Sequence, residues 1–319
     1  MTRQKKMRFS ALILMLTALG LIFYTLFFPA QAMANIRRSL SVFTSSVLPS
    51  LAVFSICTKI LVKTGFVGSL AALPFGRFWR IFGLSPSGFA AFVCGAFAGF
   101  PTGASILASL YENGEMTSEE AESILPFCNQ AGASFVVGTM GMTLFGDVRY
   151  GWILFFAQTA AALTGLLLTA WTRKKIRQPC CRERRTYSPF SAVTAAVCES
   201  AAAMVGVCGF IVFFSLCAEV IFHLFSVLPF DLPTFLPIVL SGFLEISSGM
   251  TVLASQTFSI SVRLFFAGIL LGFGGLCVFL QAFDRTERFF CSTKSYFFGK
   301  ILTAILCPAF ALLFLFLLP

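Results

Sequence analysis

The sequence predicts an all-α polytopic membrane protein, and three observations support that prediction. Hydrophobic residues make up 58% of the 319 residues, and charged residues make up only 11%. The apolar residues form blocks of about 20 residues, the length that a membrane-spanning helix needs. Short charged stretches separate these blocks. A soluble domain with this balance has too few polar side chains to cover its surface, so lipid is the expected solvent for most of the chain.

The first apolar block, residues 9–28, follows a basic N-terminus. Signal peptides share that arrangement, but this block is about as long as a complete membrane span. Residues 29–32 (PAQA) match a cleavage site only weakly. We therefore expect residues 1–36 to form a retained N-terminal transmembrane helix.

The rest of the chain divides into two similar halves, residues 37–171 and 191–319, with a basic segment at 172–190 between them. Each half contains a long apolar segment, then a segment interrupted by small residues, then two further apolar segments. The interrupted segments are residues 88–110 and 235–256. Internal repeats with interrupted segments in matching positions indicate the binding site of a transporter.

The distribution of basic residues predicts how the chain crosses the membrane. If every segment crosses and the N-terminus is cytoplasmic, the basic segment 172–190 lies outside, against the positive-inside rule. If segments 88–110 and 235–256 each enter and leave on one side, the basic segment becomes cytoplasmic. Each half then has three spanning helices plus one re-entrant helical hairpin, after one extra N-terminal helix. Because three is odd, we expect the two repeats to be inverted relative to each other.

Four short motifs occur in a fixed order along the two halves. They are 99–104 (GFPTGA), 127–134 (FCNQAGAS), 242–249 (GFLEISSG) and 272–276 (GFGGL). Their order and spacing resemble those of the YlbJ-type sporulation integral membrane proteins, which belong to the wider set with a nucleoside recognition or Gate domain. The resemblance extends over roughly residues 40–310.

The resemblance implies a role in endospore formation and the membrane passage of a small anionic solute, with dipicolinate as the leading candidate. The chain departs from the family pattern at two positions. It has Ser105 where a lysine or another polar residue is usual, and Ala133 where a proline is usual.

The candidate substrate-binding residues are small or polar residues of the interrupted segments. Glycine allows close backbone approach and proline stops a helix, so freed N–H groups and a nearby hydroxyl can hold a carboxylate. The alternatives are a packing kink with small-residue contacts and hydrogen bonding between helices. The candidates are Gly99, Pro101, Thr102, Gly103, Ser105, Asn129, Gln130, Ser134, Ser247, Ser248, Gly249 and Gln281.

Glu245 is the acidic residue placed most centrally in an apolar segment. A carboxylate there costs several kcal/mol unless it is paired, hydrated or protonated, so a functional role is the default. We expect Glu245 to bind a proton or a sodium ion for coupling; the alternative is a protonated, structural hydrogen-bonding group. Glu219 and His223 are four residues apart near the predicted outer interface, where we expect no site.

Several functions are disfavoured by motifs that the sequence lacks. Walker, HExxH, GxSxG and CxxC motifs are absent and there is one histidine, so we expect no enzyme, metal or cofactor. The net charge of +10 comes from clusters between apolar blocks, which indicates topology and not nucleic-acid binding.

The sequence therefore predicts a transporter or facilitator of a small solute. We expect it in the bacterial cell membrane or in a membrane that surrounds the forespore. Its expected partners are the solute, the lipid bilayer, and further copies or sporulation membrane proteins. The alternative is a membrane assembly or gating component of a sporulation complex that does not transport or needs a partner.

A reporter fusion tests the predicted topology. A reporter inserted within residues 172–190 is expected to be active on the cytoplasmic side, because this segment contains seven of the basic residues. A fusion at residue 229, just before the interrupted segment 235–256, is the control and should report from outside. External activity of the 172–190 fusion would show that the inverted arrangement is wrong.

Overall fold

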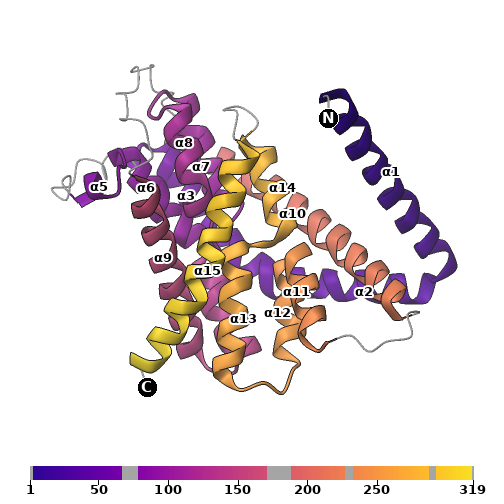
Figure 1. Ribbon diagram of the computed structural model, residues 1–319. Helices are drawn as coiled ribbons and strands as arrows, with labels where there is room; N and C mark the ends of the chain where they lie inside the picture. Colours follow the sequence, from indigo (N-terminus) through magenta and orange to yellow (C-terminus); the bar gives the residue numbers. More distant parts are fainter. Residues whose placement is uncertain (1–2, 67–77, 171–187, 227–232, 287–291, 318–319) are drawn as a thin grey trace.

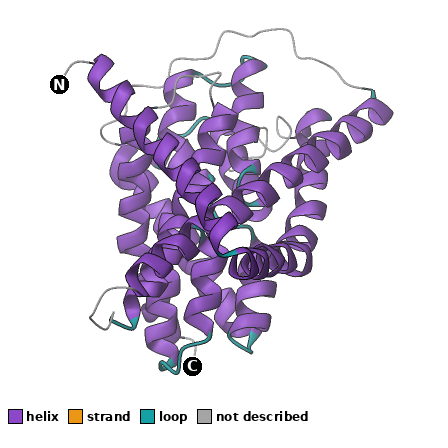
Figure 2. Ribbon diagram, turned by 90° about the vertical axis from the view of Figure 1, so that its right-hand side faces the viewer, coloured by secondary structure: helices purple, strands orange, loops and turns teal. Residues whose placement is uncertain are grey.

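The computed structural model describes residues 3–66, 78–170, 188–226, 233–286 and 292–317. Within these ranges every element of secondary structure is a helix, which confirms the all-α class, whereas the inverted repeats stay a prediction (Figure 2). Most of the basic segment predicted to be cytoplasmic lies outside the described residues.

Five helical stretches among the described residues are long and apolar enough to cross a membrane, which agrees with an integral membrane protein. They are Pro29–Lys63, Val148–Ala170, Pro189–Ser226, Ile260–Thr286 and Thr293–Leu317.

The helices follow the order that the sequence predicts, and those of the first half come before the basic segment. They are α1 (Arg3–Phe27), α2 (Pro29–Val42), the π-helix η1 (Phe43–Val47), α3 (Leu48–Lys63), α5 (Phe78–Ile81), α6 (Pro86–Ala98), α7 (Thr102–Glu112), α8 (Ser118–Cys128), the π-helix η2 (Phe135–Leu144) and α9 (Val148–Ala170). Those of the second half are α10 (Pro189–Ser226), α11 (Phe235–Leu244), α12 (Ile246–Ala254), α13 (Ile260–Phe273), α14 (Gly275–Thr286) and α15 (Thr293–Leu317).

Each interrupted segment forms two short helices. Residues Gly99–Pro101 join α6 to α7, and Glu245 alone joins α11 to α12. These four helices have 9 to 13 residues, or lengths of about 14 to 20 Å, against a hydrocarbon core of about 30 Å. Gly242 and Gly249, on either side of Glu245, lie against each other, so α11 and α12 pair as a hairpin. That each hairpin enters and leaves on one side of the membrane stays a prediction.

Each hairpin packs against a helix that is itself broken. The first predicted span of this kind ends as α8 at Cys128 and resumes as η2 at Phe135. The second ends as α13 at Phe273 and resumes as α14 at Gly275, with Gly274 in the left-handed conformation (φ +84°). A left-handed residue ends an α-helix, and glycine adopts that conformation without steric cost.

The start of α8 shows how the sequence fixes one of these elements. Thr117 caps the helix, and its hydroxyl accepts a hydrogen bond from the N–H of Glu120 at 3.3 Å. Glu119 and Glu120 lie in the first turn, where carboxylates meet the positive end of the helix dipole. The sequence of residues 117–120 (TSEE) by itself predicts a helix start here.

The helices pack in two groups. The outer group consists of α1, α2, η1, α3 and α10, which contact one another most closely. The hairpin group consists of α6 to α9, including η2, and α11 to α15. Figure 1 shows α1 at the outer edge, away from the hairpin group, with α2 running across toward α3. Large apolar side chains of α1 such as Leu14 and Leu26 are exposed, as expected for a surface that faces lipid.

Small residues let the first hairpin approach the break between α8 and η2. A Cβ atom at Gly95 would overlap the carbonyl oxygen of Cys128, and one at Gly103 would lie 2.6 Å from the same oxygen. A Cβ at Gly99 would lie 2.5 Å from the backbone nitrogen of Gly132. Three glycines of one hairpin thus contact the last residue of α8 and the segment after it.

Replacement of Gly95 by alanine tests this packing. We expect Gly95→Ala to destabilise the protein by about 1–3 kcal/mol, because the new methyl group meets backbone that has to shift. The measurement is thermal unfolding in detergent. Gly209→Ala in α10 is the matched control, since a Cβ there meets no atom within 4 Å and should cause no loss. Equal unfolding temperatures for the two variants would contradict the close contact.

A cavity between the hairpin group and the outer group

A small cavity lies where the second hairpin tip, the two breaks and the outer group meet. Ligand sites in proteins are mostly apolar pockets with a few placed polar groups. The cavity is lined by Val47, Leu51, Phe100, Gly132, Phe135, Val207, Ile211, Glu245, Ser247, Cys277, Val278 and Gln281.

The two groups of helices contribute different chemistry to this lining. The outer group supplies four aliphatic side chains from η1, α3 and α10: Val47, Leu51, Val207 and Ile211. The polar lining residues Glu245, Ser247 and Gln281 all belong to the hairpin group. A solute in the cavity therefore meets an apolar wall on one side and hydrogen-bonding groups on the other.

Glu245 sits at the tip of the second hairpin, between α11 and α12, with an extended backbone (φ −150°, ψ 121°). Its carboxylate oxygens accept hydrogen bonds from the N–H groups of Ser247 (2.8 Å) and Ser248 (2.7 Å). The side chain is 2% exposed. Glu245 thus caps α12, where a carboxylate interacts favourably with the helix dipole. Glu245 therefore both caps α12 and lines the cavity.

Gln281 of α14 brings a hydrogen-bond acceptor to the cavity. Its Nε2 donates to the sulfur of Cys277 at 3.0 Å, whereas its Oε1 is buried and has no hydrogen-bond partner within the described ranges. A buried acceptor without a donor is costly, so a solute that donates a hydrogen bond to this oxygen gains free energy. Of the predicted substrate-binding residues, Ser247 and Gln281 join Glu245 in the lining.

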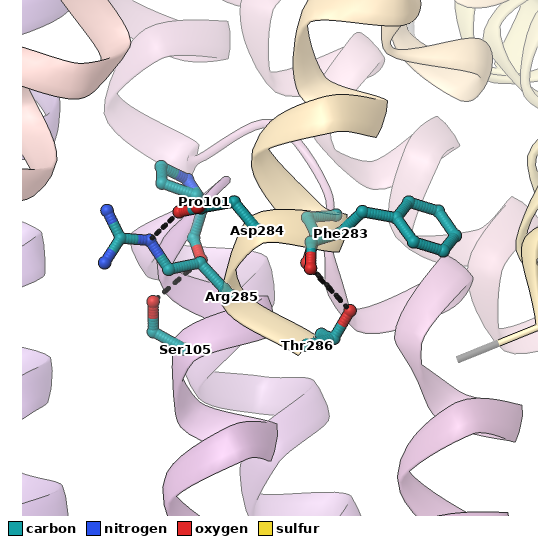
Figure 3. A network of polar contacts seen from close by, with 7 residues as sticks. Pro101, Ser105, Phe283, Asp284, Arg285 and Thr286 are labelled. Carbon is teal, nitrogen blue, oxygen red and sulfur yellow. Dashed lines mark hydrogen bonds and ion pairs between the residues drawn. The ribbon is translucent and has the colours of Figure 1, made fainter. Parts of the chain in front are cut away.

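The tip of the first hairpin contributes Phe100 to the cavity, and its predicted site residues lie outside the lining. Gly99 and Gly103 contact the break after α8, as described above. Pro101 and Ser105 bond to each other, with the Ser105 hydroxyl donating to the Pro101 carbonyl at 3.2 Å. Figure 3 shows this pair beside Asp284 and Arg285 at the end of α14, which packs against α7.

Thr102 connects the hairpin group to the outer group. Its hydroxyl donates to Ser55 of α3 at 3.4 Å, and Ser55 in turn is 3.1 Å from Ser200 of α10. Thr102 is buried and does not line the cavity. Thr102 thus forms a hydrogen bond between helices, a contact common in membrane proteins.

The predicted residues of the first break all form hydrogen bonds; Asn129 and Gln130 are buried, and Ser134 is partly buried. Asn129 donates through Nδ2 to the Tyr296 hydroxyl of α15 at 3.1 Å. Gln130 donates through Nε2 to the Phe127 carbonyl at 2.6 Å. Ser134 donates to the Ser50 carbonyl at 2.6 Å. These side chains hold the break in place, and the adjoining Gly132 and Phe135 reach the cavity.

The remaining predicted residues of the second hairpin act through the backbone or by packing. Ser248 supplies one of the two N–H groups bound by Glu245. Gly249 lies against Gly242 of α11, so that the two arms of the hairpin meet closely.

Glu219 and His223, where no site was expected, have partners away from the cavity. Glu219 accepts a hydrogen bond from Asn35 of α2 at 3.1 Å, and Asn35 in turn accepts one from Ser215. The ring of His223 packs against that of Phe28, with the centroids 4.3 Å apart. Neither residue lines the cavity.

Two buried lysines were missed in the sequence, Lys59 of α3 and Lys300 of α15. Each lies within one helical turn or two of an end of an apolar block, where lysine commonly extends toward the headgroups. The signal for Lys300 is its distance from the start of α15, since the helix begins at Thr293, seven residues earlier. That distance places the lysine almost two turns inside.

Comparison with known proteins supports the resemblance inferred from the motifs. The chain is 26% identical to the sporulation integral membrane protein YlbJ of Bacillus subtilis (strain 168), over 89% of this chain and 78% of that protein. The chain is a homologue of a YlbJ-type protein. No family model matches the chain, so the Gate-domain part of the resemblance stays a prediction.

The fold is also found in solved structures. A variant of CNTnw in an outward-facing state has a TM-score of 0.53 and 16% identity, over 98% of this chain and 87% of that one. A second CNTnw variant, in an intermediate state, has a TM-score of 0.52 and 15% identity, over 97% and 88% of the two chains. This chain and CNTnw thus share a fold over nearly the whole of this chain.

The structural contact of Glu245 can be measured apart from any transport. Glu245→Ala is expected to lower the free energy of unfolding by about 1–3 kcal/mol, because two buried N–H groups lose their acceptors. Thermal unfolding in detergent measures the change. Ser259→Ala is the matched control, since Ser259 occupies the same capping position of α13 without a side-chain hydrogen bond. A Glu245→Ala protein as stable as the control would contradict the capping role.

Proposed function

We propose that the chain is a secondary transporter or facilitator that moves a small solute through the cavity between its two helix groups during endospore formation. The observation that supports this most directly is the buried carboxylate of Glu245 at a hairpin tip, in the lining of a small cavity between two broken helices. In membrane transporters, binding sites lie near mid-membrane and are formed by interrupted helices. The YlbJ relative and the fold shared with CNTnw support a transport-type role in sporulation.

An anionic solute, with dipicolinate as the leading candidate, is the finer part of the proposal. It rests on the family resemblance. Among the described lining residues Glu245 is acidic and none is basic, so an anion would bind through hydrogen-bond donors or together with a cation. Nucleosides, which contain many hydroxyl and amide donors, are the natural comparison for the acceptors Glu245 and Gln281.

Glu245 is proposed to couple the movement of the solute to a proton or a sodium ion. The carboxylate lies in the lining, and within the described residues it forms no ion pair. Its two backbone donors leave further lone pairs free, since a carboxylate has about four acceptor positions. A cation or a solute donor can therefore bind without breaking the cap of α12.

Uptake into proteoliposomes tests the proposal. Purified protein should accumulate labelled dipicolinate or a labelled nucleoside above the level of empty liposomes. Glu245→Gln should abolish this uptake, because the amide cannot hold a coupling cation. The variant should still fold, since one carbonyl oxygen remains to cap α12. Uptake unchanged in Glu245→Gln would show that this carboxylate has no part in coupling.

A pair of substitutions on α10 tests whether the solute passes through the cavity. Val207→Phe places a larger side chain in the lining and should block uptake, whereas Val205→Phe should leave it intact. Val207 is 4% exposed and lines the cavity, whereas Val205, two residues earlier, is 75% exposed. Equal uptake by the two variants would mean that the solute takes another route.

The alternative is a membrane assembly or gating component that transports only with partners or not at all. A folded protein that takes up neither dipicolinate nor nucleosides in liposomes would favour it. Co-purification of sporulation membrane proteins with the chain from detergent extracts would then be the next measurement.

A further inference from the structure

One face of α15 contacts the breaks of both broken helices. Tyr296, Lys300 and Thr303 are spaced by four and three residues, so they share a face of the helix. Tyr296 and Lys300 both contact Asn129, at the end of α8. Thr303 donates to the Gly272 carbonyl, near the end of α13, at 2.7 Å.

Lys300 brings a positive charge to the first of these breaks. Its Nζ donates to the backbone carbonyl of Asn129 at 2.6 Å, and the residue is 3% exposed. No ion pair formed within the described ranges includes Lys300. A buried charge without a counter-charge is expensive, and such residues inside membrane proteins are functional by default.

The surroundings of the Lys300 ammonium are rich in hydrogen-bond acceptors. The last carbonyl groups of a helix lack partners within it and form the negative end of the helix dipole. In addition, Asn129 Oδ1 and Gln130 Oε1 are buried without hydrogen-bond partners in the described part of the chain. The break after α8 therefore contains several backbone and side-chain oxygens that can accept hydrogen bonds. The ammonium group of Lys300 donates to one of them, the Asn129 carbonyl.

The approach of α15 to α8 is built to bring the lysine this close. A Cβ atom at Gly299, the residue before Lys300, would lie 2.6 Å from side-chain carbons of Pro126 in α8. Only glycine fits at such a contact. At the second break the matching contact is made by the uncharged hydroxyl of Thr303. The charge is thus specific to the first break.

Broken helices of membrane transporters use the carbonyl-rich ends of half-helices to coordinate coupling cations such as sodium. We propose that Lys300 is a tethered cation, which occupies at the end of α8 the place that a free metal cation would otherwise take. Lys300 is a positioning residue, because it holds the backbone of Asn129 in place. The next carbonyl group, that of Gln130, accepts a hydrogen bond from the Phe100 N–H at 2.8 Å, and Phe100 lines the cavity. Sodium is then unnecessary at this break, whatever ion Glu245 binds.

Stability in different salts tests this inference, and it does so without the proposed transport. The melting temperature of the wild-type protein in detergent should be the same in sodium chloride and in choline chloride of equal concentration. Lys300→Ala should melt lower in choline chloride and regain several degrees in sodium chloride or ethylammonium chloride. These cations are small enough to fill the place of the lost ammonium, and binding to the folded state raises stability.

Two further variants complete the design. Lys300→Arg keeps the charge and should stay insensitive to sodium. Lys294→Ala, at the exposed start of α15, is the matched control and should behave as the wild type in every salt. A wild-type protein stabilised by sodium would overturn the inference, unless Glu245→Gln removes that effect and so assigns it to the other site. A Lys300→Ala protein that responds to no cation, or that fails to fold in all three salts, would overturn it as well.

The effect of Lys300 on transport rests on the proposed function and has its own readout, solute uptake. If the wild type transports, its uptake should depend on Lys300 and be rescued in Lys300→Ala by ethylammonium. If the wild type takes up no solute, the proposed function fails, whereas the salt dependence of melting still decides the role of Lys300.

Discussion

The structure depends on one constraint, that backbone polar groups inside a membrane find partners within the protein. Two helices of this chain are broken after Cys128 and Phe273, and both hairpin tips contain buried residues. Every free N–H or carbonyl there costs several kcal/mol unless it is satisfied. Three features of the chain satisfy these groups: the close-packed glycines of the first hairpin, the carboxylate of Glu245 and the polar face of α15.

The two halves meet the constraint with different chemistry. In the first half a neutral tip is held by the Gln130 carbonyl and the break is held by the charge of Lys300. In the second half the charge lies at the tip, on Glu245, and the break is held by the hydroxyl of Thr303. The first break thus has a cationic residue beside it, whereas the tip of the second hairpin is acidic.

Much of the fold could be predicted from the sequence, because local signals decide it. The apolar blocks, the cap at Thr117 and the central position of Glu245 are visible without any tertiary information. The partners of individual side chains are not visible, since packing chooses them. Thr102 had the composition of a site residue but bonds to Ser55, and Lys300 had the position of a flanking lysine but lies inside. The apolar wall from α10 required the meeting of segments some 160 residues apart, such as Val47 and Val207.

The contacts of α15 have a consequence for how the protein is made. This helix is synthesised after all the other described elements, and yet Tyr296, Lys300 and Thr303 contact the breaks of both halves. Asn129 of the first break and Lys300 are separated by more than half of the 319 residues, so the break is synthesised long before its partner. The polar atoms of the first break therefore lack these partners until α15 has been synthesised and has docked against them.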